Sequence, residues 1–204
     1  LRRTTDEFTS KQDNFISILV PAPVIAAQTC DREVVTEYSS TTSRAVLQHD
    51  LTSGSNVYAS LSEGFKAGGY ATYECTEPYD PEEVTSLEFG YKGSLGENTS
   101  LNASLFRYDY TDFQVLQVVG IQTVTRNAGD ATVNGLELEA LSNLNDSLSM
   151  SYGLTLLDAT YGEFLNTNGL EPQLGQQQLE GKYLNNAPKV SVNVGLNYTT
   201  NLSS

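Results

Sequence analysis

The sequence predicts an all-β protein built from antiparallel strands. Apolar and polar residues alternate along most of the chain from residue 83 onward, the pattern of strands with one apolar and one polar face. Apolar stripes with helical spacing are hard to find. Short turns rich in Gly, Asn, Ser and Asp alternate strictly with long connections. Together these three observations favour consecutive, up-and-down strands over a helical or mixed fold.

Seven runs carry the alternation and are expected to be strands. The clearest is 189–198, where four Val and Leu side chains and Tyr198 share one face and Ser, Asn and Gly share the other. In 135–140 the leucines lie opposite Glu137 and Glu139. A weaker run, 45–51, is included. The expected strands are 45–51, 57–62, 85–92, 101–105, 135–140, 147–156 and 189–198, with room for an eighth.

The connections indicate which kind of sheet these strands form. Short turns are expected at 52–56, 95–99 and 143–146, and long connections at about 65–83, 112–131 and 161–188. Outer-membrane β-barrels have this rhythm of short periplasmic turns and long extracellular loops. Alternation alone also fits a soluble sheet with one wet face. The rhythm therefore favours an antiparallel transmembrane β-barrel segment of about seven or eight strands.

Composition excludes several classes of protein. The 204 residues include 11 Lys and Arg against 25 Asp and Glu, for a net charge of -14. Such an acidic chain has no basic stripe for nucleic acid or for a polybasic membrane-surface module. No apolar run approaches the length of a transmembrane helix, which excludes a helical membrane protein.

Motifs for catalysis, metals and cofactors are missing. The only histidine is His49, beside Asp50, and no G-x-S-x-G elbow accompanies it. The glycines at 64, 68 and 69 do not form a phosphate-binding loop. We therefore expect no catalytic residue, no metal site and no cofactor, and we expect that the chain is not an enzyme.

Five segments resemble those of one known family, both in their residues and in their order along the chain. The sequence is similar to TonB-dependent outer-membrane receptors in YASLSEGFKAGGY (58–70), PEEVTSLEFGYK (81–92), FRYDYTDFQ (106–114), NAGDATVNGLELE (127–139) and LNNAPK (184–189). One departure is Ser43, where the family has a proline. The resemblance implies that 44–204 is a partial receptor β-barrel and that 1–43 is a poorly matched loop or strand remnant.

The resemblance also implies partners. A receptor of this family isolates a lumen with a barrel of about 22 strands, which a plug domain blocks until the TonB system pulls it. The chain starts at Leu1 without an initiator Met and is expected to be a fragment. Its partners would be the missing plug domain and remaining barrel strands, TonB acting through that plug, outer-membrane lipid and an unknown small-molecule ligand. No nucleic acid is expected.

The function implied is a part in the uptake of a scarce ligand, such as a siderophore, cobalamin or a glycan, across a bacterial outer membrane. Two alternatives remain open. One is a secreted or surface-displayed structural or adhesive β-protein that is soluble and associates through open sheet edges. The other is a hydrolase, which would depend on His49.

Candidate site residues follow from the same resemblance. Loop aromatics would contact the ligand, or else pack the loops: Tyr70, Tyr73, Tyr79, Tyr110 and Phe113. Three carboxylates are expected on the lumen face, where they would meet the plug or the ligand path, or simply be solvated: Glu88, Glu137 and Glu139.

The two cysteines are candidates for a disulfide. Cys30 and Cys75 would fall in loops on the same extracellular side of a hairpin spanning 45–65, so the resemblance implies that they pair. Two unrelated free thiols are the alternative, since spacing alone does not decide pairing.

Overall fold

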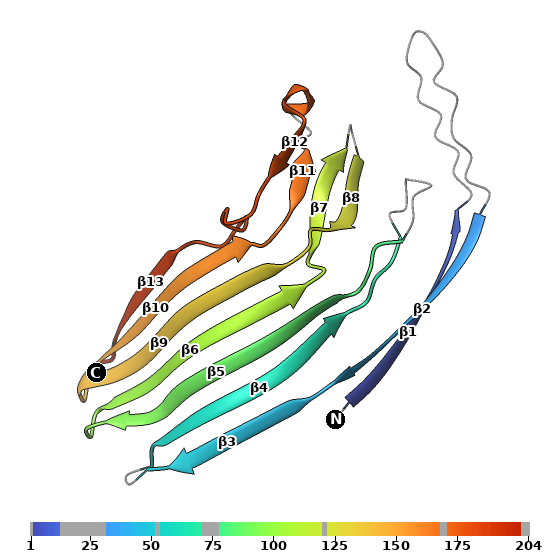
Figure 1. Cartoon of the computed structure of the whole chain (residues 1–204). Helices are drawn as coiled ribbons and strands as arrows, with labels where there is room; N and C mark the ends of the chain where they lie inside the picture. The colour runs from blue at the N-terminus through green and yellow to red at the C-terminus, as the bar shows by residue number, and fades with distance from the viewer. Residues whose placement is uncertain are drawn as a thin grey trace.

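The structure, a computed structural model, describes residues 2–12, 32–51, 54–70, 78–119, 122–167 and 171–200. Nearly all of its regular structure is strand (Figure 1). In this part of the chain no helix is both long enough and apolar enough to cross a membrane. The elements are β1 (Arg2–Gln12), β2 (Arg32–Thr42), β3 (Arg44–Asp50), β4 (Asn56–Lys66), β5 (Glu82–Leu95), β6 (Thr99–Thr111), β7 (Gln114–Val119), β8 (Gln122–Asn127), β9 (Ala131–Asn145), β10 (Leu148–Tyr161), β11 (Leu165–Thr167), a 3-10 helix (Pro172–Leu174), β12 (Gln176–Gln178) and β13 (Val190–Tyr198).

The main sheet is an antiparallel meander. Its seven strands lie in the order β3-β4-β5-β6-β9-β10-β13, so strands that are close in the sequence are also neighbours in space. Between β6 and β9 the chain makes a separate hairpin, β7–β8, and between β10 and β13 it makes a second, β11–β12. The sequence expectation of consecutive antiparallel strands is confirmed.

The two ends of this sheet differ. At one end, here the turn end, tight turns join β5 to β6 and β9 to β10 (Figure 1), and the Leu51 amide donates to the Ser55 carbonyl (2.7 Å) where β3 and β4 adjoin. At the opposite end, here the loop end, the long connections and both extra hairpins emerge (Figure 1). Gly96 illustrates the turn chemistry, because its φ of +68° lies in the left-handed region that glycine adopts without strain.

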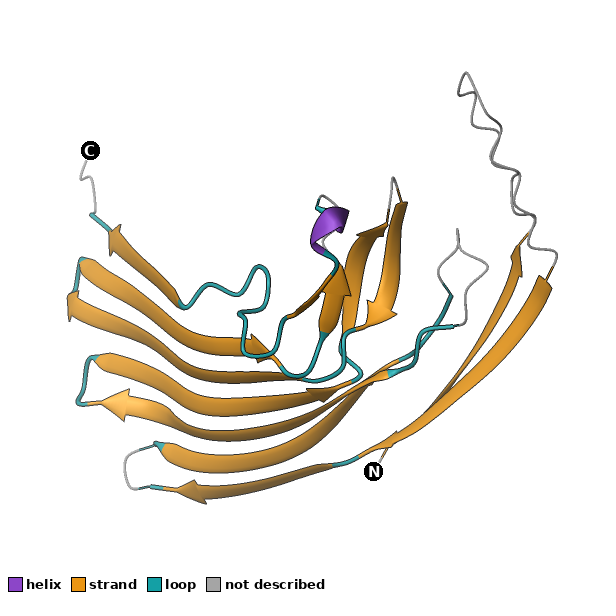
Figure 2. Ribbon diagram, turned by 45° about the horizontal axis from the view of Figure 1, so that its top comes forward, coloured by secondary structure: helices purple, strands orange, loops and turns teal. Residues whose placement is uncertain are grey.

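The two faces of the sheet also differ. Rows of large apolar side chains cover one face, here the apolar face; they are more than half exposed at Leu47 (76%), Phe89 (51%), Leu105 (59%) and Val192 (66%). The other, here the polar face, carries Ser, Asn, Thr, Glu and Tyr, and its side chains are more buried, as at Ser60 (8%) and Phe106 (7%). Figure 2 shows that the sheet is strongly curved. Side chains crowd on the concave side of a curved sheet, so the burial places the polar face on that side.

Register aligns the side chains of each face across the strands. On the apolar face, Leu47 lies opposite Ala59, which lies opposite Phe89, followed by Leu105 and Leu136. On the polar face, Glu88 lies opposite Ser60 and Phe106, and Phe106 lies opposite Gly135. A side chain at Gly135 would overlap the Phe106 ring, so the bare backbone there lets the ring lie flat on β9.

The seven expected strands are present, but several are longer than the sequence indicated. The run expected at 101–105 belongs to the 13-residue strand β6, and the run at 135–140 to the 15-residue strand β9. Two of the expected connections, 112–131 and 161–188, contain the hairpins β7–β8 and β11–β12. Short pairings inside long loops carry little alternation, which explains why the sequence did not indicate them.

The main sheet is open in the described part of the chain. β3 pairs with β4 alone and β13 with β10 alone, so each leaves one edge free. β1 and β2 form a separate two-stranded sheet, and β2 runs into β3 through Ser43. The division of the chain after residue 43 stays a prediction.

Candidate ligand-binding site

Side-chain hydrogen bonds tie three connections together at the loop end. The Asn127 amide donates to the carbonyl oxygens of Asp80 (3.0 Å) and Asp112 (2.7 Å) and accepts from the Asp80 amide (2.7 Å). Gln114 donates through its side chain to the carbonyl oxygens of Ala67 (3.0 Å) and Asp80 (3.1 Å). This polar cluster fixes the base of the β7–β8 hairpin against the connection from β4 to β5.

Four aromatic rings form a chain beside this cluster. Tyr110 meets Phe113 edge to face with ring centroids 5.3 Å apart, Phe113 lies 6.4 Å from Tyr161, and Tyr161 lies 5.5 Å from Phe164. Edge-to-face pairs at these separations are favourable. Tyr161 is 9% exposed, and Ala131 and Ala159 beside it on the polar face are almost fully buried. The rings thus form a small packed core at the loop end of an otherwise open sheet.

A cavity of about 660 Å³ opens next to this aromatic chain. Its floor is the polar face of β9 and β10, one wall is β7, and another wall is the segment that follows β12. That segment folds back on β10, because Tyr161 donates its amide to the Lys182 carbonyl (2.9 Å) and Leu184 donates its own to Ala159 (2.9 Å). The lining residues that matter below are Phe113, Gln117, Tyr161, Phe164, Asn166 and Lys182.

The lining combines ring faces with amides and one amine. Gln117 on β7 donates a hydrogen bond to the side-chain oxygen of Asn166 on β11, which joins the two hairpins across the cavity. Lys182 adds a positive charge to a chain that is strongly acidic overall. Ligand pockets are typically about 300–1,000 Å³ and mainly apolar, with a few polar groups that orient the ligand. The cavity therefore suits an organic molecule with polar or anionic substituents.

The structure brings only some of the predicted aromatic residues to this place. Tyr110 and Phe113 belong to the aromatic chain, and Phe113 lines the cavity. Tyr79 pairs with Gly69, the residue before Tyr70, in the neighbouring connection. Neither Tyr70 nor Tyr79 lines the cavity. Tyr73 lies outside the described residues. Their part in ligand binding stays a prediction.

Sequence reasoning missed the residues that complete the cavity: Tyr161, Phe164, Asn166, Lys182 and Gln117. The available signal was Tyr161-Gly-Glu-Phe164, an aromatic pair where a strand enters a long connection.

The three predicted carboxylates lie on the polar face, below the cavity. Glu88 accepts a hydrogen bond from the Tyr58 hydroxyl, and the Lys92 ammonium lies 5.3 Å from the centre of the Tyr58 ring. Glu137 lies opposite Thr155, and Glu139 opposite Gly153. Their placement on one face follows from the alternation, while a contact with a plug or ligand stays a prediction.

Other candidate sites lie elsewhere. His49 lies on the apolar face, one residue before the end of β3. The described residues hold no cluster of His, Cys, Asp and Glu able to bind a metal ion. Cys30 and Cys75 lie outside the described residues, so their disulfide stays a prediction.

Comparison with known proteins decides the family. The family described as "TonB dependent receptor-like, beta-barrel" matches residues 4–203. The chain belongs to this family of TonB-dependent receptors. No curated protein sequence matches the chain. The open curved sheet, with its short turns at one end and loops at the other, is a partial receptor barrel.

Solved receptors share the fold. The ferric yersiniabactin uptake receptor FyuA from Yersinia pestis superposes with a TM-score of 0.65 at 19% identity, over 85% of this chain and 26% of that one. The ferric-catecholate import receptor Fiu from E. coli K12 gives 0.59 at 17% identity, over 96% and 28%. The copper transporter OprC gives 0.58 at 19% identity, over 87% and 27%. The chain thus spans about a quarter of the length of these receptors.

The family is one of transporters and receptors of bacterial outer membranes. Its members use a plug domain and TonB, and they bind small-molecule ligands.

Proposed function

We propose that this TonB-dependent receptor chain forms part of the wall and extracellular loops of an outer-membrane transporter that captures a ferric siderophore. The cavity at the loop end is the observation that carries this proposal. It opens on the polar face, which faces inward in the barrels of outer-membrane proteins. A ligand held there by Phe113, Tyr161 and Lys182 would lie at the mouth of the lumen.

The choice of ligand class rests on the cavity and on the relatives together. The name of FyuA mentions ferric yersiniabactin, that of Fiu mentions ferric catecholate, and that of OprC mentions copper. A ferric siderophore is large and partly aromatic, and it often bears negative charge, which fits ring faces beside a lysine better than a bare cation would. Cobalamin and glycans gain no support from these names.

The apolar face supports a membrane location for the chain. Its exposed rows of Leu, Val and Phe form a continuous band, whereas soluble proteins rarely expose large contiguous apolar patches. The free edges of β3 and β13 would pair with further strands of the same barrel, because hydrocarbon offers no hydrogen bonds to unpaired backbone groups. We propose the plug and TonB as the remaining partners, and transport rather than catalysis as the activity.

Binding measurements on the receptor that contains this chain test the proposal. Replacing Phe113 and Tyr161 together by Ala should weaken the binding of its ferric siderophore by at least about tenfold, because buried aromatic anchors dominate such interfaces. The Tyr152→Ala variant is the control, since Tyr152 lies on β10 like Tyr161 but on the apolar face. Titration calorimetry with a panel of hydroxamate, catecholate and phenolate iron chelates gives the affinities. If no chelate of the panel binds, a ferric siderophore is not the ligand. If the double substitution leaves binding unchanged, the cavity is not the binding site.

A further inference from the structure

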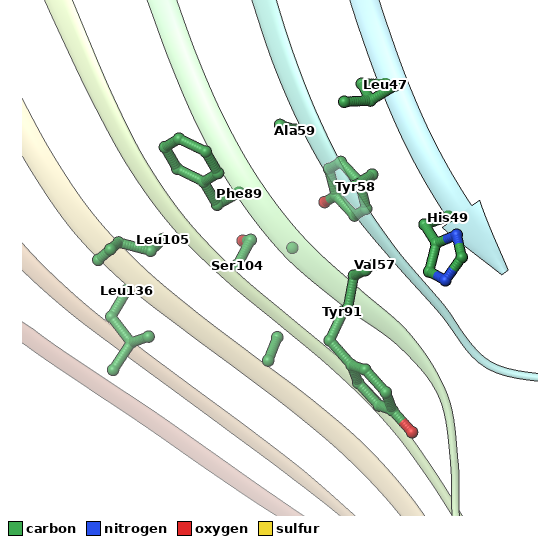
Figure 3. A pocket seen from close by; sticks show the side chains of 12 residues that line it. Leu47, His49, Val57, Tyr58, Ala59, Phe89, Tyr91, Ser104, Leu105 and Leu136 are labelled. Carbon is green, nitrogen blue, oxygen red and sulfur yellow. The ribbon is translucent and has the colours of Figure 1, made fainter. Parts of the chain in front are cut away.

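A second cavity, of about 510 Å³, lies on the apolar face near the turn end. It crosses β3, β4, β5, β6 and β9 (Figure 3). Six side chains define what is called here the apolar hollow: Leu47, Ala59, Phe89, Ala103, Leu105 and Leu136.

The hollow exists because small residues stand in two apolar rows. Ala59 lies between Leu47 and Phe89 in one row. Ala103 lies between Tyr91 and Leu138 in the row nearer the turn end. Because both alanines are truncated where their neighbours are long, the surface is recessed in the middle of an exposed apolar band. The band continues on β13 in Val190, Val192 and Val194, which are all more than half exposed.

One end of the hollow is polar. His49 lies there, one residue before the end of β3, and Tyr91 lies two strands away in the same row, with Val57 between them (Figure 3). The Tyr91 hydroxyl points toward the turn end, where it lies 2.9 Å from the carbonyl oxygen of Ser94 and 3.0 Å from the Ser55 hydroxyl. Tyrosines with an apolar ring and a hydrogen-bonded hydroxyl mark the boundary between hydrocarbon and headgroups. The polar end of the hollow therefore lies at the level of the lipid headgroups.

We propose that the apolar hollow binds one acyl chain of a phospholipid of the periplasmic leaflet, whose phosphate accepts a hydrogen bond from His49. This inference rests on the proposed function, because it needs the apolar face to lie in the membrane. An acyl chain suits the hollow for two reasons. Two lining residues with hydroxyl groups, Tyr58 and Ser104, belong by register to the polar face, so the apolar-face side chains in the middle of the hollow are all hydrocarbon, which disfavours a peptide segment. The hollow is also continuous with the apolar band that would contact lipid.

Filling the hollow tests the proposal. The double variant Ala59→Leu/Ala103→Leu puts side chains into the space, whereas Ala45→Leu/Ala140→Leu adds the same number of carbon atoms to the apolar face outside it. The receptor is extracted from the outer membrane in mild detergent, and native mass spectrometry counts the phospholipid molecules that remain bound. We expect one phospholipid on the wild type and on the control, and none on the filled variant.

His49→Ala tests the headgroup contact. Loss of the hydrogen bond to the phosphate should shorten the time for which the phospholipid stays bound by roughly tenfold. The filled variant should bind no phospholipid at all. Should the filled variant fail to assemble, the single Ala103→Leu variant replaces it, with Ala45→Leu as its control. Equal phospholipid counts on wild type, control and filled variant would overturn the proposal.

The same preparations separate this inference from the proposed function. If the receptor is found in the membrane and binds its ferric siderophore but retains no specific phospholipid, phospholipid binding at the apolar hollow is refuted and the proposed function stands. A receptor absent from the membrane fraction refutes the proposed function.

Discussion

Asn127, Ala128 and Gly129, here the NAG segment, hold the connections at the loop end together. Asn127, the first residue of the NAG segment, bonds the backbone of two other connections, and Ala128 behind it is 1% exposed. Gly129 completes the segment with a φ of +80°, and a side chain there would lie 2.5 Å from the Glu163 carbonyl oxygen. The segment thus holds the loops together, and it positions the cavity without lining it.

Replacing Asn127 by Ala should therefore loosen the loops before it affects the sheet. The substitution removes three hydrogen bonds, one of which satisfies the Asp80 amide. At about 0.5–1.5 kcal/mol for each of the three bonds, the loss amounts to roughly 1.5–4.5 kcal/mol of local stability. Hydrogen exchange of the Asp80 amide, followed by mass spectrometry, should accelerate, while amides in the middle of β5 and β6 keep their protection. Asn127→Asp keeps the acceptor oxygen but loses both donors. Its Asp80 amide should exchange at a rate between those of the wild type and of Asn127→Ala.

Strands show where sequence patterns stop being informative. In β6 the expected run ended at Leu105, yet the strand continues to Thr111. Beyond Leu105 the alternation reverses: the aromatic residues Phe106 and Tyr108 lie on the polar face, stacked 4.8 Å apart, and Arg107 and Asp109 pair on the other. The strand leaves the apolar band at this point, so a pattern that assumes one apolar face cannot follow it.

The candidate site was predictable to a similar extent. Tyr110 and Phe113 were predicted because they lie near the end of a recognisable strand. Tyr161 and Lys182 were not, because their approach to Phe113 depends on how β9 and β10 align and on the fold of a long loop. Local alternation determines the faces of a sheet, whereas contacts between loops depend on residues far apart in the sequence.

Adjacent positions on β10 test the assignment of the two faces. Leu154 lies on the apolar face, opposite Leu138, and Thr155 lies on the polar face, opposite Glu137. Leu154→Lys should destabilise the receptor by about 2–4 kcal/mol, because it moves an ammonium group into hydrocarbon. Thr155→Lys should cost less than about 1 kcal/mol, since its charge meets a wet lumen and the Glu137 carboxylate. Urea titration of the receptor refolded in phospholipid vesicles gives both values, and equal losses would contradict the assignment.

The seven strands of the main sheet form a wall that does not close on itself in the described part of the chain. A barrel abolishes sheet edges, but here β3 and β13 each present a row of backbone groups to no described neighbour. In a bilayer each unsatisfied group costs several kcal/mol. Favourable burial of the apolar face in lipid therefore competes with the cost of two edges, and neighbouring strands remove that cost.

Expressed alone, the 204-residue chain should accordingly fail to form a stable monomer in a bilayer. Refolded with vesicles, it should stay accessible to protease, or associate through its edges in a concentration-dependent way, whereas the whole receptor should be protected and keep its compact form on unheated gels. A proline at Val192, in the middle of the β13 edge, should reduce that association, because it removes a ladder donor and keeps the chain out of a paired strand. The Val46→Pro variant makes the same change on the β3 edge. A protected monomer of the isolated chain would show that seven strands satisfy their own edges in the membrane, and the partial-barrel account of its function would then fail.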